Sequence, residues 1–123
     1  MTGFIAEGVD RVRSQGPLVH NVTNLVAMTF SANVLIAAGA APIMATAPEE
    51  TRELAAISAA LVVNMGTLTR EWIAGAKPAI EGARQAGRPW ILDPVGVGAS
   101  AFRRETAADL LTRSPRIIRG NAS

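Results

Sequence analysis

The sequence predicts an α/β fold in which a layered parallel sheet carries helices on both faces. The first observation behind this prediction is a strict alternation of short apolar runs with longer helical segments, the pattern of repeated strand–helix–strand units. The second is that runs such as Ala60–Asn64 are apolar and β-branched, as strands covered on both faces are. The third is length, because 123 residues suffice for one domain with its own core.

Start and stop signals mark the elements in order. Gly39 lies where the second helix needs a left-handed cap, and Pro48 opens the third helix with an acidic first turn. Thr69 caps the fourth helix, in which Pro78 predicts a kink or a break near residues 75–77. The expected helices are 3–14, 25–38, 48–58, 70–86 and 103–112, and the expected strands are 18–22, 41–44, 60–64, 90–92 and 116–119.

Composition excludes several classes of protein. The sequence has no cysteine, which excludes disulfides, thiolate metal sites and a cysteine nucleophile within these residues. Glu7 and Asp10 interrupt the N-terminal segment, which is therefore unlike a signal peptide, and polar residues interrupt the longest apolar stretch, at 25–41. A soluble, cytoplasmic protein with no membrane partner is expected.

The basic pI of about 10.4 is a weak sign of nucleic-acid binding. The formal net charge is only +2, and eleven of the twelve basic residues are arginine, so almost nothing titrates between neutral pH and the arginine range. The arginines are scattered, with Arg103–Arg104 the only adjacent pair, and no aromatic residues are interleaved with them. We expect no nucleic-acid partner.

Polar, glycine or charged residues follow all five expected strands. In open parallel sheets, ligands bind outside the carboxyl ends of the strands, where loops and helix N-termini converge. The other ends of the strands carry no comparable concentration. This pattern predicts a ligand site at the carboxyl edge, with the candidates His20, Asn21, Thr23, Asn24, Met44, Thr46, Asn64, Gly66, Thr67, Asp93, Gly96, Gly98, Arg119 and Asn121.

Asp93 directly follows an expected strand and precedes Gly96, Gly98 and a helix that Ser100 introduces. Glycines allow close backbone approach, amides at a helix start hold phosphate, and a carboxylate beside a phosphate site commonly organises magnesium. The alternative is that Asp93 caps a turn that the glycines merely shape. Arg119 likewise either meets an anionic group, such as a transferring phosphoryl group, or forms a surface ion pair.

The remaining candidates have two interpretations each. Asn21, Asn24 and Asn64 either bind a small polar ligand or satisfy loop backbone groups. His20, the only histidine, fits a packed or hydrogen-bonded residue better than an acid–base group, and Met44 either joins the core or lines an adaptable pocket. The sequence holds no Walker A pattern, no GxGxxG and no supported catalytic triad. The residues alone therefore indicate a protein that handles a small molecule or a phosphate.

Five ordered segments of the chain resemble hydroxyethylthiazole kinases. They follow the order and spacing of that family over almost the whole chain, which makes the combination far more specific than any single segment. Val97 and Ser100 are minor departures, since they replace the alanine and threonine that are more usual there. The segments are Pro17–Asn24, Gly39–Ala45, Asn64–Leu68, Asp93–Ala99 and Arg119–Ser123.

The resemblance implies a ribokinase-like fold and ATP-dependent phosphorylation of 4-methyl-5-(2-hydroxyethyl)thiazole in thiamine biosynthesis or salvage. It implies ATP as co-substrate, Mg2+ as the metal and a homotrimer with active sites between subunits. By position, it implies that Met44, Asn24 and Gly66 bind the thiazole, that Arg119 and Asn121 bind ATP, and that Asp93 belongs to the magnesium–phosphate network.

Members of this family are much longer than this chain, and their C-terminal half holds a Gly-rich anion hole, its reactive residue and most of the nucleotide pocket. We therefore expect residues 1–123 to be the N-terminal part of a single ribokinase-like kinase domain, with the catalytic residues beyond Ser123. We also expect residues 1–123 alone to have little or no kinase activity and an unprotected sheet edge.

Two alternatives stand beside the thiazole kinase. One is a non-catalytic ligand-binding or oligomerisation module derived from such a kinase. The other is a ribokinase-like kinase that acts on a different small alcohol, such as a pyrimidine, against which Met44 and the segment His20–Asn24 argue.

Overall fold

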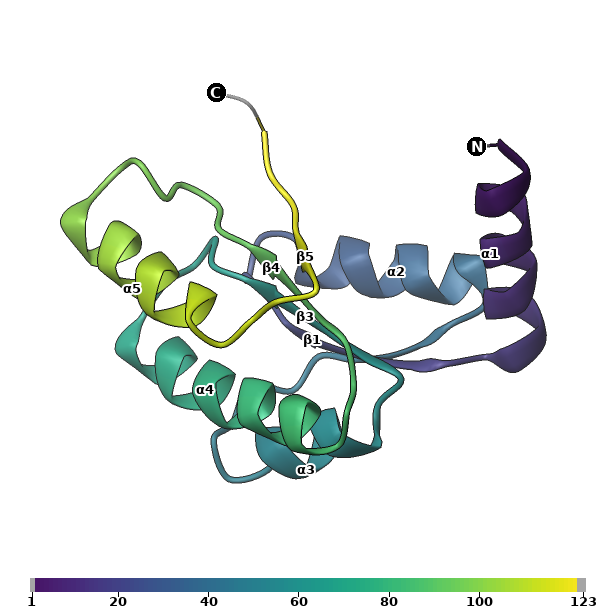
Figure 1. The fold of residues 1–123 in the computed structure, drawn as a ribbon, viewed down its shortest axis with the longest axis horizontal. Helices are drawn as coiled ribbons and strands as arrows, with labels where there is room; N and C mark the ends of the chain where they lie inside the picture. Colours follow the sequence, from purple (N-terminus) through teal and green to yellow (C-terminus); the bar gives the residue numbers. More distant parts are fainter. Residues whose placement is uncertain (1, 122–123) are drawn as a thin grey trace.

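The computed structural model describes residues 2–121 and confirms the predicted α/β architecture (Figure 1). All five strands are parallel and lie in the order β2-β1-β3-β4-β5, so β3 is the centre of the sheet. The strands are β1 (Leu18–Val22), β2 (Ala41–Ile43), β3 (Ala60–Asn64), β4 (Trp90–Asp93) and β5 (Ile117–Ile118). The helices are α1 (Thr2–Gln15), α2 (Met28–Ala38), α3 (Thr51–Ile57), α4 (Arg70–Gln85) and α5 (Ala101–Leu111).

Two helices begin three residues later than expected, α2 at Met28 and α3 at Thr51. The residues before α2 form a turn instead of a first helical turn, because the side-chain oxygen of Asn24 accepts the amide N–H of Ala27 at 2.8 Å. Residues 48–50 also form a turn, so Pro48 precedes α3 rather than opening it. Before α2 a side-chain bond therefore replaces the first amide–carbonyl bonds of the helix, whereas the turn before α3 is held by the amides of Glu50 and Thr51, which both donate to the carbonyl of Ala47.

The predicted break at Pro78 is absent, since α4 runs without interruption from Arg70 to Gln85. A proline leaves the carbonyl four residues earlier without its usual N–H partner. Here that carbonyl belongs to Ala74, which is exposed, so water can replace the missing bond. Thr69 caps α4 as predicted, because its hydroxyl accepts the amide N–H of Trp72 at 3.0 Å.

One face of the sheet, here called the covered face, carries the core. The helices α3, α4 and α5 pack on it (Figure 1), and the strand side chains that point toward them are buried. The indole of Trp90 is also anchored, because its N–H donates to the carbonyl of Arg113 at 3.2 Å. This core consists of Val22, Leu61, Val63, Met65, Trp90 and Leu92 with Ala55, Trp72, Ala76, Ala79, Ile80, Ala83, Ala107 and Leu110 from the helices.

Helix α4 approaches α3 and the preceding loop more closely than any side chain would allow. A Cβ atom added to Gly75 would lie within van der Waals overlap of the Thr46 carbonyl oxygen, and one added to Gly82 would overlap that of Arg52. The hydroxyl of Thr51 donates to the carbonyl of Gly75 at 2.8 Å. Close backbone contacts therefore hold α4 against α3 and against the loop that follows β2.

The opposite face, here called the open face, is only partly covered. Helix α2 lies over it (Figure 1), separated from β1 and β3 by a cavity of about 340 Å³, and α2 buries none of its residues. Phe30 of α2 is 74% exposed, and Ile117 of β5, which points to this face, is 53% exposed. Despite these apolar side chains, no helix within residues 2–121 is both long and apolar enough to cross a bilayer.

The two edge strands differ in what they offer to another strand. The amide of Ala41 donates inward, to the carbonyl of Pro17 at 2.9 Å. Because the backbone nitrogens of successive residues in a strand point to opposite sides, the nitrogen of Pro42 points outward, away from the sheet. At the other edge, β5 is only two residues long and lies between Arg116 and Arg119.

Candidate functional site

The carboxyl ends of the parallel strands meet at one edge of the sheet, as the sequence predicts for a ligand site. Asn24 follows β1, Asn64 ends β3, Asp93 ends β4 and Arg119 follows β5. Since β1, β3, β4 and β5 are consecutive neighbours in the sheet, these four side chains stand in a row. The chain thereby brings together residues that are 95 positions apart in the sequence.

Hydrogen bonds connect this row from one end to the other. The amide nitrogen of Asn24 donates to Oδ1 of Asn64 at 2.8 Å. The amide nitrogen of Asn64 then donates to Oδ2 of Asp93 at 3.0 Å. Arg119 completes the row by donating to the same Oδ2 from Nη2 at 2.9 Å and from Nε at 3.2 Å. We call this set of four residues the polar row.

The Asp93–Arg119 ion pair forms one end of the polar row. The Asp93 side chain is 15% exposed, whereas that of Arg119 is 60% exposed. Arg119 thus forms an ion pair, which is one of the two roles predicted for it. Its exposed guanidinium still leaves donors that an incoming anion can reach.

A cavity of about 530 Å³ adjoins this ion pair. Its walls are the loop after β4 and the segment after β5, namely Asp93, Pro94, Val95, Gly96, Val97, Gly98, Arg119, Gly120 and Asn121. Ser100 caps the helix that follows, because its hydroxyl accepts the amide of Arg103 at 3.2 Å. Gly96 has a φ of +70°, which favours glycine there. Ala122 and Ser123, which end the last family-like segment, lie outside the described residues.

The other end of the polar row is packed tightly around Gly66. A Cβ atom on this glycine would lie 2.6 Å from the amide nitrogen of Asn24, so a larger residue would displace that side chain. The hydroxyl of the next residue, Thr67, accepts the amide N–H of Leu25 at 3.0 Å. The loops after β1 and β3 are therefore joined at two places, and Asn24 and Gly66 lie in contact.

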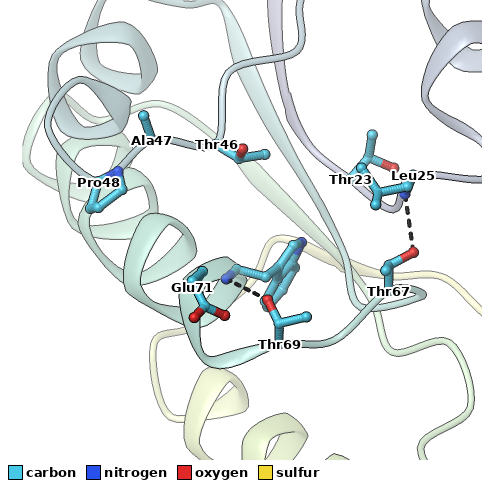
Figure 2. Close-up of a pocket in the computed structure, with 9 residues that line it drawn as sticks. Thr23, Leu25, Thr46, Ala47, Pro48, Thr67, Thr69 and Glu71 are labelled. Carbon is cyan, nitrogen blue, oxygen red and sulfur yellow. Dashed lines mark hydrogen bonds between the residues drawn. The ribbon is translucent and has the colours of Figure 1, made fainter.

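A second cavity, of about 250 Å³, opens beside these loops (Figure 2). Its walls combine threonine hydroxyls with apolar groups from the ends of β1, β2 and β3 and the start of α4. Asn24, Gly66 and Met44 do not line this cavity. Neighbours of two of them do, namely Thr23 and Leu25 on either side of Asn24, and Thr67 directly after Gly66. The lining residues are Thr23, Leu25, Thr46, Ala47, Pro48, Thr67, Thr69, Glu71 and Trp72.

Met44 and His20 belong to the junction between β1 and the loop after β2. Met44 is half-buried one residue beyond the end of β2. His20 is fully buried, and its Nε2 lies 2.8 Å from the carbonyl oxygen of Ala45, to which it donates as a neutral imidazole. Burial lowers the pKa of His20 despite this bond. The structure thus confirms His20 as a packed, hydrogen-bonded residue that holds the loop carrying Met44.

The three asparagines satisfy groups of the protein itself. Asn24 and Asn64 bond to each other and to loop amides. Asn21 is buried, and its amide nitrogen donates to the carbonyl of Val19 at 3.1 Å. Asn24 and Asn64 therefore satisfy loop amides, which is the second of their two predicted roles, whereas Asn21 bonds to a carbonyl within β1. Asn24 is 8% exposed, next to the second cavity.

Arg103 is a residue of this site that the sequence did not reveal. Its guanidinium donates to the carbonyls of Met65 at 2.8 Å, Gly66 at 2.9 Å and Val95 at 2.9 Å. It therefore holds the loop after β3 against the loop after β4. The one available signal was its position in the first turn of the helix after the Asp93 loop, and a pattern of residue types cannot show that its partners are backbone carbonyls.

The described residues fit a magnesium ion only in a limited way. Within residues 2–121 no group of three or more acidic or histidine side chains converges on a point. In the polar row the carboxylate is that of Asp93, and its Oδ2 already accepts from Asn64 and Arg119. Oδ1 of Asp93 is left for a cation, which suits Mg2+ when phosphate oxygens and water complete its shell.

Comparison with known proteins places this geometry in a family. The sequence model of the hydroxyethylthiazole kinase family matches residues 9–123. A hydroxyethylthiazole kinase of Rhizobium etli is 55% identical over 115 residues, which cover 94% of this chain and 45% of that protein. One of Cereibacter sphaeroides is also 55% identical over 115 residues, with 94% of this chain and 44% of that protein covered.

A solved structure agrees with these sequence comparisons. The hydroxyethylthiazole kinase from Pyrococcus horikoshii OT3 superimposes with a TM-score of 0.93 at 44% sequence identity. The match covers 98% of this chain and 47% of that one. The chain thus spans about half the length of the relatives that it matches.

Proposed function

The chain belongs to the hydroxyethylthiazole kinase family, and we propose that the protein transfers the γ-phosphoryl group of ATP to the hydroxyl of 4-methyl-5-(2-hydroxyethyl)thiazole, in thiamine biosynthesis. The observation that carries this proposal is the polar row, which runs from the loops beside the smaller cavity, suited to an alcohol, to the wider cavity, suited to phosphates. Phosphoryl transfer depends mostly on holding two substrates in line and stabilising charge, so adjacent sites on one sheet edge suit the reaction.

We propose that Asn24, Gly66 and Met44 form the alcohol-binding side. The rigid contact between Gly66 and Asn24 supports this assignment, because a preorganised wall loses little entropy when a small ligand binds. Met44 contributes an adaptable apolar surface for an aromatic ring that contains sulfur. The His20–Ala45 bond holds the loop on which Met44 lies.

We propose that Arg119 and Asn121 bind the nucleotide phosphates. Both residues line the cavity of about 530 Å³, and the exposure of Arg119 supports its movement toward an anion. When Arg119 bonds to a phosphate, Oδ2 of Asp93 keeps only its bond from Asn64, and the negative charge of the carboxylate is left without its partner at the cavity. Asp93 would then hold magnesium, which supplies neutralisation of phosphate charge when bound.

The described residues supply positioning and charge for this reaction rather than its base. In the polar row, the carboxylate of Asp93 accepts from the amide of Asn64 and is paired with Arg119 or, once the nucleotide is bound, would be paired with magnesium, which disfavours proton abstraction from the alcohol. We propose that the base and the remaining nucleotide contacts come from chain beyond residue 123, as the greater length of the relatives supports. Residues 1–123 alone are then expected to show little or no kinase activity.

We propose further that the protein is a cytoplasmic homotrimer. The apolar surface of the first two helices supports self-association, since Phe4, Ile5 and Phe30 are 78%, 58% and 74% exposed. Sedimentation of the full-length gene product measures its subunit number. A monomer at every concentration would contradict this assembly.

Transfer of labelled phosphate from ATP to the thiazole alcohol, by the full-length gene product, tests the proposed function. We expect Arg119→Ala to lower kcat/KM for ATP by about 100-fold, the scale for loss of one charge-stabilising donor. Arg116→Ala is the matched control, because Arg116 is exposed at the other end of β5 and lines neither of the two cavities beside the polar row. No transfer by the unmodified protein, or faster transfer to a pyrimidine alcohol, would contradict the proposal.

Calorimetric titration of residues 1–123 addresses the non-catalytic alternative. Binding of the thiazole alcohol without ATP binding, combined with an inactive full-length protein, would favour a ligand-binding module over a kinase.

A further inference from the structure

Asn64 has its hydrogen-bonding groups committed inside the polar row. Its Oδ1 accepts from the amide nitrogen of Asn24 at 2.8 Å and from the backbone amide of Gly66 at 2.9 Å. Its Nδ2 donates to Oδ2 of Asp93 at 3.0 Å. The residue is 7% exposed, so these bonds lie away from solvent.

The arrangement requires an amide in one orientation. Two N–H donors face the oxygen of Asn64, and a carboxylate faces its nitrogen. Rotating the amide by half a turn would place its N–H groups against the two N–H donors of Asn24 and Gly66, and its oxygen against the carboxylate of Asp93. A carboxylate at this position would place two negative charges in contact, and a buried unsatisfied polar group destabilises its surroundings.

The partners of Asn64 belong to the two halves of the proposed site. Asn24 and Gly66 form the alcohol-binding side, and Asp93 with Arg119 forms the nucleotide side. In the polar row, Asn64 is the link between these sides, at the end of the central strand β3. Its side chain therefore bonds to both sides at once.

We propose that Asn64 is a positioning residue that fixes the alcohol-binding loops relative to the Asp93–Arg119 pair. The inference rests on the proposed function and adds to it a residue that contacts neither reacting group. Without the amide, Asn24 and Gly66 lose their shared acceptor while Asp93 loses its neutral donor. Both substrates are then held less well, even where the fold survives.

Kinetics of Asn64→Asp in the full-length gene product test this role. The substitution keeps the shape of the side chain and replaces the donor toward Asp93 by an acceptor. We expect the KM values for the alcohol and for ATP each to rise about tenfold or more, the factor given by an unsatisfied buried partner. Gln85→Glu is the matched control, because it makes the same amide-to-carboxylate change at an exposed position at the C-terminal end of α4 and should leave both KM values within about twofold.

A residue that only stabilised the sheet would give a different result. Loss of stability lowers the fraction of folded enzyme, and therefore kcat, without changing either KM. A lowered kcat with unchanged KM values in Asn64→Asp would overturn the proposal.

The exchange Asn64→Asp with Asp93→Asn provides a second test if the single variant does not fold. The exchange retains one carboxylate in the row and restores a donor–acceptor pair with reversed direction, while a carboxylate oxygen at position 64 still accepts from Asn24 and Gly66. We expect KM for the alcohol to return to within about threefold of the unmodified protein, because the missing pair is restored. KM for ATP should stay raised, because Arg119 no longer faces a charged partner.

If KM for the alcohol is raised equally in the exchange and in Asp93→Asn alone, the proposed role of Asn64 is overturned. Failure of the proposed function is recognised separately, since the unmodified protein would then transfer no phosphate to the alcohol.

Discussion

The two faces of the sheet differ in how completely they are buried. On the covered face, Leu61, Val63 and Leu92 have no exposed surface under α3, α4 and α5. On the open face, Val34 of α2 is 50% exposed and Ile117 of β5 is 53% exposed. Since buried apolar area is the main stabilising contribution, the covered face supplies most of the stability of the described chain. The polar row lies at the carboxyl edge that both faces share.

The largest effect is expected from a pair of strand residues that tests this contrast directly. Leu92 of β4 points to the covered face and Ile117 of β5, the register partner of Ile91, points to the open face, with 0% and 53% of their surfaces exposed. Leu92→Ala should lower the free energy of unfolding by about 2–5 kcal/mol. Ile117→Ala should change it by less than about 1 kcal/mol.

Urea unfolding followed by circular dichroism measures both variants. Should Leu92→Ala leave too little folded protein, Leu92→Val makes the same comparison with a smaller cavity. Equal losses for the two positions would mean that the open face is as well packed in solution as the covered face.

An intermediate effect is expected at the shared edge, from Arg103. Arg103→Met removes three bonds to carbonyls of two loops and should lower the free energy of unfolding by about 2 kcal/mol. Its neighbour Arg104 makes a single long bond of 3.3 Å to Gly98, so Arg104→Met should have an effect of about 0.5 kcal/mol or less.

Hydrogen exchange at the amides of residues 64–68 measures where Arg103 acts. Faster exchange there in Arg103→Met, with unchanged exchange in α3, is the expected pattern. Uniformly faster exchange would instead assign Arg103 to global stability.

The burial of His20 predicts a dependence of stability on pH. Because burial lowers the pKa of His20 from its ordinary value of 6.5, the unfolded chain binds a proton that the folded chain does not. The free energy of unfolding should therefore fall as the pH falls below 6.5, by up to about 1.4 kcal/mol per pH unit, until the lowered pKa is reached.

His20→Gln isolates this contribution, because His20 is the only histidine of the chain and glutamine retains a donor for Ala45. Unfolding midpoints between about pH 7.5 and pH 5.5 should decline less steeply in the variant. If the midpoints of the two proteins declined equally with pH, folding would not lower the pKa of His20.

The smallest effect is expected from the ion pair between α4 and α5. Lys77 lies 2.9 Å from Asp109, and both side chains are more than 40% exposed. The hydrogen bond from Lys77 is the main cause that lowers the pKa of Asp109, so the pair contributes at neutral pH and is lost in acid. Asp109→Asn should lower the free energy of unfolding by about 0.2–1 kcal/mol, and about 1 M salt should abolish the difference. A larger effect would mean that the pair is shielded from solvent.

The fold was predictable from local signals, whereas much of the site was not. Alternation, Thr69 as a cap and the apolar run 60–64 each act within a few residues, and each prediction is confirmed. The break at Pro78 was wrong because the exposure of Ala74 depends on how α4 packs.

The residues of the polar row were predictable as a set, and their bonds were not. Each of Asn24, Asn64, Asp93 and Arg119 lies at or just after the end of a strand that the sequence predicts. Parallel strands bring these ends to one edge of the sheet. Which amide faces which carboxylate depends on register, such as the pairing of Asn64 with Asp93. The three carbonyl partners of Arg103 depend on two loop conformations at once, for which no residue type is a signal.

The contrast between the edge strands has a consequence for aggregation. The outward nitrogen of Pro42 cannot donate a hydrogen bond, so β2 is a poor template for a strand from another molecule. The β5 edge has no such proline, as expected for an unprotected edge, yet it offers only two residues between two arginines. Charge repulsion between Arg116 or Arg119 and their copies on another molecule opposes stacking there. Neutralising both arginines should therefore promote fibril-like association through Ile117 and Ile118, an effect absent at β2.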